Sequence, residues 1–393
     1  MKNSKCNLCG SSDFESIYKR NNIEVITNKE SFKIDVNNVI CKKCGLVFQN
    51  PVMEKEKLAD FYSDQYRVDE SKGETVRKQQ KEYLDKFINK EKGTILDIGS
   101  FEGVLLNLFK EEGWTCIGVE PCQEAAKICR DKYGIEVYEE MFENINFDDN
   151  MFDIIAIRHV LEHVDDPMNT IRVMKKYLKD DGIIFIEVPD ISKFDPNNIA
   201  DSYDFQHIYN FSSSVMKNYI CKCGLDLVNI DNKLPYAGMR FICKKGIEKD
   251  IVSDYENTKA LVLNYKKKRE ENLNYMANLL VEKNKQWKVE NKKIFLYGAG
   301  FHTAQLFQYV MNKEDFNIVG LLDSSKDKWE KEFWGYKTYS ADKIDQLHAD
   351  VIIISSYAFQ DEIYNMLKQF ERVGVEIVKL YRKTYSYDSI VYK

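Results

Sequence analysis

Acidic residues and glycines follow three apolar stretches between residues 95 and 163, in a pattern that can hold a nucleotide. The first stretch ends in residues 97–103 (DIGSFEG), the second in residues 118–120 (GVE), and the third leads into residues 161–163 (LEH). A doubly wound sheet uses this order of strand, glycine-bearing turn, helix, strand and acidic residue to hold the adenosyl half of a cofactor at the carboxyl ends of its strands. The pattern therefore predicts an enzyme.

The turn after Asp97 favours S-adenosylmethionine over a dinucleotide. A pyrophosphate needs close approach of the backbone at the middle glycine position of this turn, where Phe101 stands. Glu120 ends the second stretch, where its carboxylate can accept hydrogen bonds from both ribose hydroxyls. The alternative is an α/β domain without a ligand, in which the glycines only permit a tight turn. The residues assigned to the cofactor site are Asp97, Gly99, Ser100, Phe101, Gly103, Glu120, Phe142 and Arg158.

Four of the ten cysteines form two Cys-x-x-Cys pairs, Cys6 with Cys9 and Cys41 with Cys44. Two such turns can present four thiolates in the tetrahedral arrangement that Zn²⁺ prefers. Alternating residues at 23–27 suggest a small hairpin sheet between the pairs. Redox-active or unpaired thiols are the alternative, but a redox pair starts a helix in a thioredoxin-like unit, and neither pair has that context. We therefore predict a structural zinc site.

Strands and helices alternate through the region that must position these residues. Strands are expected at 94–98, 115–119, 136–138, 152–157 and 183–188, with helices at 73–92, 104–111, 123–133 and 168–178. Later strands near 227–230 and 238–243 would complete a seven-stranded sheet. The expected fold class is α/β, with a central seven-stranded doubly wound sheet between a small N-terminal zinc-binding β domain and a C-terminal Rossmann-like domain.

The C-terminal pattern resembles a second nucleotide fold. Apolar residues 293–297 run into Gly298-Ala299-Gly300, and parallel strands are expected at 318–323 and 350–354. Thr303 replaces the third glycine of the dinucleotide fingerprint, so NAD binding here is only an alternative. Charged residues before this pattern have helical spacing, which predicts a solvated helix. The expected domains are 1–70 (zinc-binding), 71–248 (doubly wound sheet), 249–291 (helical linker) and 292–393 (Rossmann-like).

Composition narrows the class of protein. The 57 Lys and Arg against 63 Asp and Glu give a net charge of −6, which provides no basic surface for nucleic acid. No apolar run approaches the roughly 20 residues that span a bilayer, and the first residues lack the apolar core of a signal peptide. We therefore expect a cytoplasmic protein that binds neither nucleic acid nor membrane.

These motifs resemble a known family. Asp97-x-Gly-x-x-x-Gly, residues 118–121 (GVEP), residues 152–155 (FDII) and residues 161–167 (LEHVDDP) look like a class I S-adenosylmethionine-dependent methyltransferase. A four-cysteine zinc domain before this unit and a Rossmann-like domain after it resemble the C-methyltransferases of nucleotide-linked deoxysugars. Residues 45–51 and 61–66 are similar to the segment that follows the second cysteine pair in that family. The resemblance covers essentially the whole chain.

The segment that would carry the substrate signature departs from that family. The family has a Tyr-His-Glu-His sequence whose last histidine acts as the base. The matching residues here are Asp204-Phe205-Gln206-His207, so the histidine is kept while glutamine replaces glutamate. The resemblance therefore implies the architecture and leaves the methylated atom open.

His207 is the candidate general base, because removing a proton from an oxygen or carbon acceptor needs a group that titrates near neutrality. The alternative is a histidine that packs or caps before the helix expected from Ser212. His163 is expected to orient the loop rather than to take a proton. Tyr62 and Tyr66 could close over the substrate. The catalytic assignments are His207, Tyr66 and Gln206.

The expected activity is S-adenosylmethionine-dependent methylation of a nucleotide-linked sugar or a surface-polysaccharide precursor, by a monomer or homodimer. O-methylation of a sugar or other small metabolite is the first alternative. A catalytically inactive binding protein with the same fold and an enzyme with NAD as a second cofactor are further alternatives.

Overall fold

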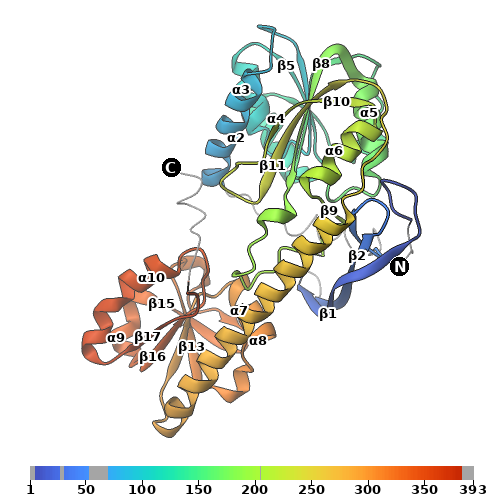
Figure 1. Cartoon of the computed structure of the whole chain (residues 1–393). Coiled ribbons are helices and arrows are strands. Elements are labelled where there is room, and N and C mark those ends of the chain that lie inside the picture. Colours follow the sequence, from blue (N-terminus) through green and yellow to red (C-terminus); the bar gives the residue numbers. More distant parts are fainter. Residues whose placement is uncertain (1–4, 27–30, 53–69, 204, 383–393) are drawn as a thin grey trace. The chain divides into compact units, whose positions relative to one another are not determined.

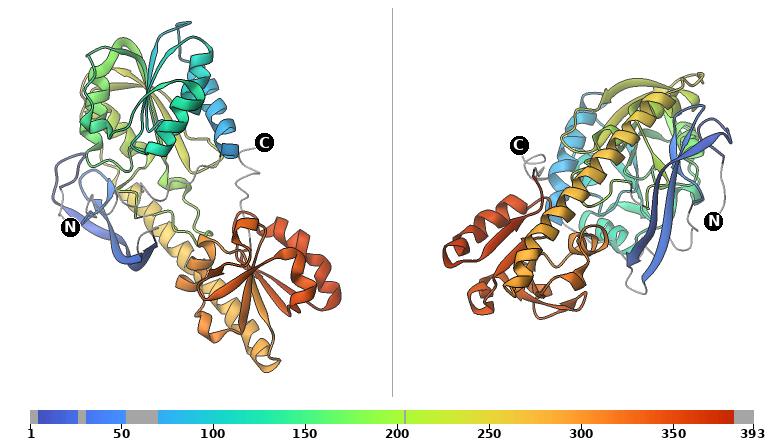
Figure 2. Two further views of the ribbon diagram at one scale, coloured as in Figure 1. Left: turned by 180° about the vertical axis from the view of Figure 1, so that it is seen from behind. Right: turned by 60° about the horizontal axis from the view of Figure 1, so that its bottom comes forward.

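The computed structural model describes residues 5–26, 31–52, 70–203 and 205–382. The chain forms two compact units, one from Met1–Phe194 and Tyr203–Leu263 and the other from Asp195–Ser202 and Asn264–Lys393. The chain therefore passes from one unit to the other three times. Figures 1 and 2 show the sheets and helices of each unit.

A four-stranded sheet near the N-terminus has the order β1-β2-β3-β9, with antiparallel neighbours. Its strands are β1 (Phe14–Ile26), β2 (Ser31–Cys41), β3 (Val47–Gln49) and β9 (Tyr209–Asn210). β1 and β2 lie between the two cysteine pairs in sequence and β3 follows the second pair. β9 comes from a point about 160 residues later, where Tyr209 lies opposite Phe48. This pairing joins the His207 segment to the cysteine-bearing sheet.

The central sheet has seven strands in the order β10-β11-β8-β7-β4-β5-β6. β6, β5, β4, β7 and β8 are parallel neighbours, and β11 and β10 complete the sheet in antiparallel fashion. Asp97 on β4 lies opposite Gly118 on β5 and Ala156 on β7, so the three candidate strand ends meet at one edge. The strands are β4 (Thr94–Ile98), β5 (Thr115–Val119), β6 (Glu136–Tyr138), β7 (Phe152–Arg158), β8 (Leu178–Pro189), β10 (Leu225–Asp231) and β11 (Gly238–Lys245).

Helices cover both faces of this sheet because its strand residues are apolar on both sides. One core joins β4, β7 and β8 to helices α2, α3 and α4 through side chains such as Leu84, Phe109 and Cys129. The other core joins the opposite face to α5 and α6 through side chains such as Met174 and Met216. The helices are α2 (Glu70–Asp85), α3 (Val104–Glu111), α4 (Gln123–Tyr133), α5 (Pro167–Tyr177) and α6 (Ser213–Lys222), with short 3₁₀ turns η1 (Phe142–Asn144) and η2 (Ile191–Lys193).

The second unit contains a six-stranded sheet in the order β14-β15-β13-β12-β16-β17, parallel except for β14. Its strands are β12 (Ile294–Tyr297), β13 (Ile318–Asp323), β14 (Glu332–Phe333), β15 (Tyr336–Ser340), β16 (Val351–Ile354) and β17 (Glu376–Lys379). Its helices are α8 (Phe301–Tyr309), α9 (Ile344–Leu347) and α10 (Gln360–Leu367), with 3₁₀ turns η3 (Lys313–Asp315), η4 (Lys326–Lys328), η5 (Ala341–Lys343) and η6 (Lys368–Val373). The long helix α7 (Tyr255–Val289) enters this unit from the first one.

The excursion of residues 195–202 is fastened inside the second unit. The Arg269 guanidinium donates to the carbonyls of Asn198 and Ile199 at 2.6 and 2.7 Å and pairs with Asp201. Tyr265 donates to Asp201 at 2.9 Å. The segment before His207 is therefore held by residues of α7.

The α/β fold class predicted from the sequence is confirmed, including the seven-stranded sheet, the N-terminal β sheet with its cysteines and the α/β sheet near the C-terminus. Within the described residues, no helix has both the length and the apolar character needed to cross a membrane.

Candidate functional site

The four cysteines converge on one point at the end of the N-terminal sheet. Cys6 Sγ lies 3.4 Å from Cys44 Sγ, Cys9 Sγ lies 3.5 Å from Cys41 Sγ, and all four sulfurs lie within 4.8 Å of one another. Zn–S bonds of about 2.3 Å in a tetrahedron place sulfurs about 3.8 Å apart, so the spacing suits Zn²⁺. Hydrogen bonds among these thiols lower the pKa of Cys41 and raise the pKa of Cys6 and Cys44. The donor set fits a structural zinc ion.

The glycine-bearing turn between β4 and α3 is shaped by close packing. Gly99 and Gly103 adopt left-handed backbone angles, with φ of 70° and 77°. A Cβ at Gly99 would lie 2.3 Å from Val160, and one at Gly103 would lie 2.1 Å from the Cys129 sulfur. Phe101 adopts φ 52° without being a glycine, a conformation that is uncommon and concentrated at functional loops. The turn is therefore held tightly at the end of β4.

Glu120 links this turn to the end of β5. Its Oε2 accepts a hydrogen bond from the backbone N–H of Phe101 and its Oε1 accepts one from Cys122, both at 2.9 Å. The side chain is buried, and burial raises the pKa of Glu120 while the two N–H groups oppose that rise. Each carboxylate oxygen has a second lone pair. Glu120 can therefore fix the turn and still accept hydrogen bonds from ribose hydroxyls.

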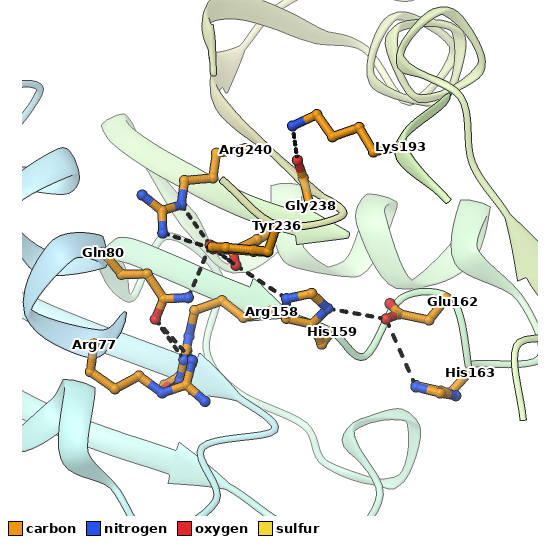
Figure 3. Close-up of polar contacts among 12 residues, drawn as sticks. Arg77, Gln80, Arg158, His159, Glu162, His163, Lys193, Tyr236, Gly238 and Arg240 are labelled. Atoms are coloured by element: carbon orange, nitrogen blue, oxygen red, sulfur yellow. Dashed lines mark hydrogen bonds and ion pairs between the residues drawn. The ribbon is translucent and has the colours of Figure 1, made fainter. Parts of the chain in front are cut away.

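Asp97 and Arg158 form a buried ion pair beneath the same edge. Arg158 Nη2 lies 2.6 Å from Asp97 Oδ2, and both side chains are at most 2% exposed. Burial raises the pKa of Asp97, and the Arg158 charge opposes that rise. Arg158 also donates to Gln80 on α2 at 3.0 Å, and Gln80 donates to Glu187 on β8 at 2.9 Å (Figure 3). The pair thereby anchors the end of β7 to α2 and β8.

The polar chain continues from Glu187 to the loop after β7. Glu187 accepts hydrogen bonds from Arg240 at 2.7 Å and Tyr236 at 2.6 Å, and lies 3.1 Å from His159 Nε2. His159 Nδ1 lies 3.5 Å from Glu162 Oε1, so its ring is placed between two carboxylates (Figure 3). These carboxylates raise the pKa of His159 above its usual value although burial acts against them. His159 has φ 53°, which turns the chain sharply at the strand end.

The loop that carries His207 is fixed from two sides. The Gln49 side-chain amide donates to the carbonyls of Phe205 and His207 at 2.8 and 2.9 Å. From the other side, His163 Nδ1 donates to the carbonyl of Gln206 at 2.9 Å. The rings of His163 and His207 are tilted with centroids 5.0 Å apart. Burial lowers the pKa of His207, which keeps the imidazole neutral and able to accept a proton.

Comparison with known protein families identifies the central sheet. Residues 73–230 match the family described as "Methyltransferase domain", and residues 290–380 match the family described as "C2185-like, N-terminal". The first match spans the glycine-bearing turn, Glu120 and His207. The chain contains an S-adenosylmethionine-dependent methyltransferase domain.

The relatives of the methyltransferase domain are distant. The C-methyltransferase NovU of Streptomyces niveus is 22% identical over 253 residues, covering 60% of this chain and 59% of that protein. An uncharacterised protein of Methanocaldococcus jannaschii is 33% identical over 135 residues, covering 34% of this chain and 62% of that protein. A methyltransferase structure from Mesorhizobium loti is 11% identical, covers 42% of this chain and 96% of its own, and has a TM-score of 0.37. The chain spans about three fifths of the length of these two curated relatives.

Most residues assigned to the cofactor site from the sequence lie on the turn after β4 or contact it. Glu120 bonds to the turn directly, whereas Asp97 and Arg158 bond to each other below it. The Ser100 hydroxyl is buried and has no hydrogen-bond partner among the described residues. Phe142 on η1 is buried and packs edge-to-face on Tyr177. A buried hydroxyl in need of a partner and a carboxylate with spare acceptor capacity fit the nucleoside half of S-adenosylmethionine.

Of the three residues assigned to catalysis from the sequence, two lie near the loop after β7 and one lies outside the described residues. His207 and the backbone of Gln206 lie beside His163, at the edge formed by the loop after β7. Tyr62 and Tyr66 lie outside the described residues. Three residues that sequence reasoning left without a role contact this edge: Gln49, Glu162 and Glu187. For Gln49 and Glu187, the only available signal was a polar residue within an otherwise apolar strand.

Proposed function

We propose that the chain transfers a methyl group from S-adenosylmethionine to a carbon atom of a nucleotide-linked sugar or of a related surface-polysaccharide precursor, with His207 as the general base. The observation that carries this proposal is the half-buried His207, whose ring lies beside His163 of the loop after β7 and whose pKa is lowered by desolvation, so that a neutral imidazole is favoured. The 22% identity to a C-methyltransferase supports carbon as the acceptor. The resemblance to the deoxysugar enzymes supports the substrate class.

Different residues of the site would bind the cofactor and remove the proton in an in-line transfer of the methyl group. S-adenosylmethionine, when bound, supplies an electrophilic methyl group on a sulfonium. Glu120 and the turn after β4 would hold the nucleoside and so fix the direction of the methyl group. His207 would take the proton that the acceptor carbon must lose. Carbon acidity next to a keto group would make that proton transfer accessible to a neutral imidazole.

We also propose that the four cysteines hold a structural zinc ion. The close spacing of the four sulfurs supports this assignment. Since β3 follows the second cysteine pair and carries Gln49, the ion would stabilise the strand that fixes the His207 loop.

Mass spectrometry tests the reaction directly. Purified protein is incubated with S-adenosylmethionine and a panel of nucleotide sugars that includes 4-keto-6-deoxy forms. The expected result is a gain of one methylene mass on a keto sugar, resistant to reagents that cleave O-methyl groups. A gain only on sugars without a keto group, in a form that those reagents remove, would establish O-methylation instead. No gain on any sugar, with the cofactor bound, would refute the nucleotide-sugar substrate.

A further inference from the structure

We propose that Glu162 is a positioning residue that supplies the counter-charge for the imidazolium formed when His207 takes a proton. This inference rests on the proposed function, because it assumes that His207 is the base. It assigns a role to a buried carboxylate that the cofactor site does not use.

The Glu162 carboxylate lies close to three histidines of the site. Glu162 is 1% exposed, and its Oε1 lies 3.5 Å from His159 Nδ1 and 3.8 Å from His163 Nε2. One carboxylate oxygen of Glu162 and one ring nitrogen from each of His163 and His207 lie within 4.8 Å of one another. A carboxylate at that separation stabilises a positive charge on His207, because the Glu162 carboxylate is buried and the two rings are half-buried.

Glu162 and His207 each keep a polar atom with unused hydrogen-bonding capacity. Glu162 Oε2 and His207 Nδ1 are both buried, and neither has a hydrogen-bond partner among the residues that the structure describes. Buried polar atoms without partners are rare and costly, and at an active site they indicate a group that bonds during turnover. Although His159 already contacts Oε1, the second oxygen can serve a second cation.

Two hydrogen bonds hold the loops of Glu162 and His207 in register. The N–H of Tyr209 donates to the carbonyl of Glu162 at 3.1 Å. The hydrogen bond from His163 Nδ1 to the carbonyl of Gln206 leaves His163 Nε2 as the ring atom that faces Glu162. The loop after β7 and the His207 loop are thus joined at two points, which fixes the separation between carboxylate and imidazole.

The charges in the step balance. The acceptor carbon forms its bond to the methyl carbon while the sulfur–methyl bond breaks and leaves its electron pair on sulfur. The proton from the acceptor moves to neutral His207, which becomes a cation. Three titratable groups face His207 in the described residues, namely Glu162, His163 and His159. Of these only Glu162 is an anion, and it raises the pKa of His207 while burial and His159 lower it.

Histidine NMR of the zinc-loaded full-length protein with S-adenosylhomocysteine tests the inference without an acceptor. The chain has five histidines, and single substitutions assign their signals. In Glu162→Gln the titration midpoint of His207 should fall by about one pH unit, because an opposite charge within a few ångströms has been removed. Glu124→Gln is the matched control, since it removes an exposed carboxylate from α4 and should leave His207 unchanged. An unchanged His207 midpoint in folded Glu162→Gln would overturn the inference.

A second variant keeps the test decisive if Glu162→Gln does not fold. Glu162→Asp retains the charge and withdraws it by one methylene, so the His207 midpoint should fall in the same direction by a smaller amount. A His207 titration midpoint equal to that of the wild type in folded Glu162→Asp would again overturn the inference. Because these titrations need no acceptor, a failed sugar panel leaves their outcome intact and the two proposals fail separately.

Kinetics and metal analysis supply two further outcomes. With a turned-over sugar, the acid limb of kcat/KM should move to lower pH in Glu162→Gln while the plateau falls about tenfold, whereas a merely structural defect lowers the plateau without moving the limb. Zinc analysis and Mn²⁺ titration should find no ion beyond the cysteine site. A second ion that is lost in Glu162→Gln would overturn the inference and identify Glu162, His163 and His207 as metal ligands.

Discussion

At the scale of single residues, Glu120 and Asp97 lie at the same edge of the central sheet but make different kinds of contact. Glu120 accepts hydrogen bonds from backbone N–H groups of two neighbouring turns and can still accept further hydrogen bonds from a ligand. Both carboxylate oxygens of Asp97 instead accept hydrogen bonds from Arg158. The sequence predicts carboxylates at both strand ends, because the order of strand and acidic residue is visible in it. It does not reveal the pairing of Asp97 with Arg158, since that contact joins residues 61 positions apart.

Glu120→Ala should weaken binding of S-adenosylhomocysteine by about 100-fold, equivalent to about 3 kcal/mol. The change removes the acceptor for the ribose hydroxyls and also releases the N–H of Phe101 that holds the turn. Isothermal titration calorimetry measures the affinity. Glu124→Ala, an exposed change on α4, is the control and should bind as the wild type does. Equal affinity in Glu120→Ala would place the nucleoside elsewhere.

His207→Ala should reduce methyl transfer by at least about 100-fold while changing the S-adenosylhomocysteine affinity less than twofold. The reason is that the imidazole would act on the acceptor and not on the nucleoside. Turnover of a sugar from the panel and calorimetry give the two quantities. His348→Asn is the control, because His348 belongs to the other unit and Asn tolerates its φ of 50°. Near-normal turnover would remove His207 from the mechanism.

At the scale of elements, the two-residue strand β9 determines where the His207 loop lies. β9 pairs with β3 of the cysteine-bearing sheet, and Gln49 at the end of β3 bonds to the loop before β9. Most strands and helices were predicted within a few residues, because each has its own periodic pattern. The helix expected at 73–92 instead ends at Asp85, and the strand expected at 183–188 begins at Leu178. β9 was not predicted, since two residues carry no periodicity and their partner strand is about 160 residues away.

Gln49→Ala should lower the free energy of unfolding by about 1–3 kcal/mol, because it removes the amide that donates to the carbonyls of Phe205 and His207. Turnover should fall about 10-fold to 100-fold from misplacement of His207, with cofactor affinity retained. Chemical denaturation and sugar turnover measure these effects. Ser16→Ala removes an exposed hydrogen bond to Asn37 in the same sheet and should change neither quantity appreciably. A Gln49 variant with full turnover would show that β9 pairing alone positions the loop.

At the scale of the whole molecule, the chain distributes one site over segments that are distant in sequence. The first unit takes its cysteine-bearing sheet, its methyltransferase domain and the His207 segment from two separate stretches of chain. The C-terminal α/β sheet was predicted from its glycine turn and apolar strands. The excursion of residues 195–202 into the second unit was not, because its anchors Tyr265 and Arg269 read as part of a solvated helix.

Loss of the proposed zinc ion should abolish methyl transfer before it abolishes cofactor binding. Cys44→Ser removes one of four thiolates, so the variant should contain less than one zinc ion and should lose most turnover, while S-adenosylhomocysteine still binds. Metal analysis, turnover and calorimetry on one preparation separate these effects. Cys221→Ser, which alters a cysteine outside the cluster, should keep both metal and activity. Full turnover in zinc-free Cys44→Ser would show that the sheet holds its shape without the ion.

The three passages of the chain between its two units constrain how this protein can be recombined. A fusion at residue 263 would import a foreign C-terminal unit while the native residues 195–202 remain behind, without the Arg269 that binds their carbonyls. A working chimaera must therefore exchange the short excursion together with residues 264–393. Recombination between homologous genes with a single crossover should therefore give mostly inactive proteins. Active recombinants should take residues 195–202 and residues 264–393 from the same parent.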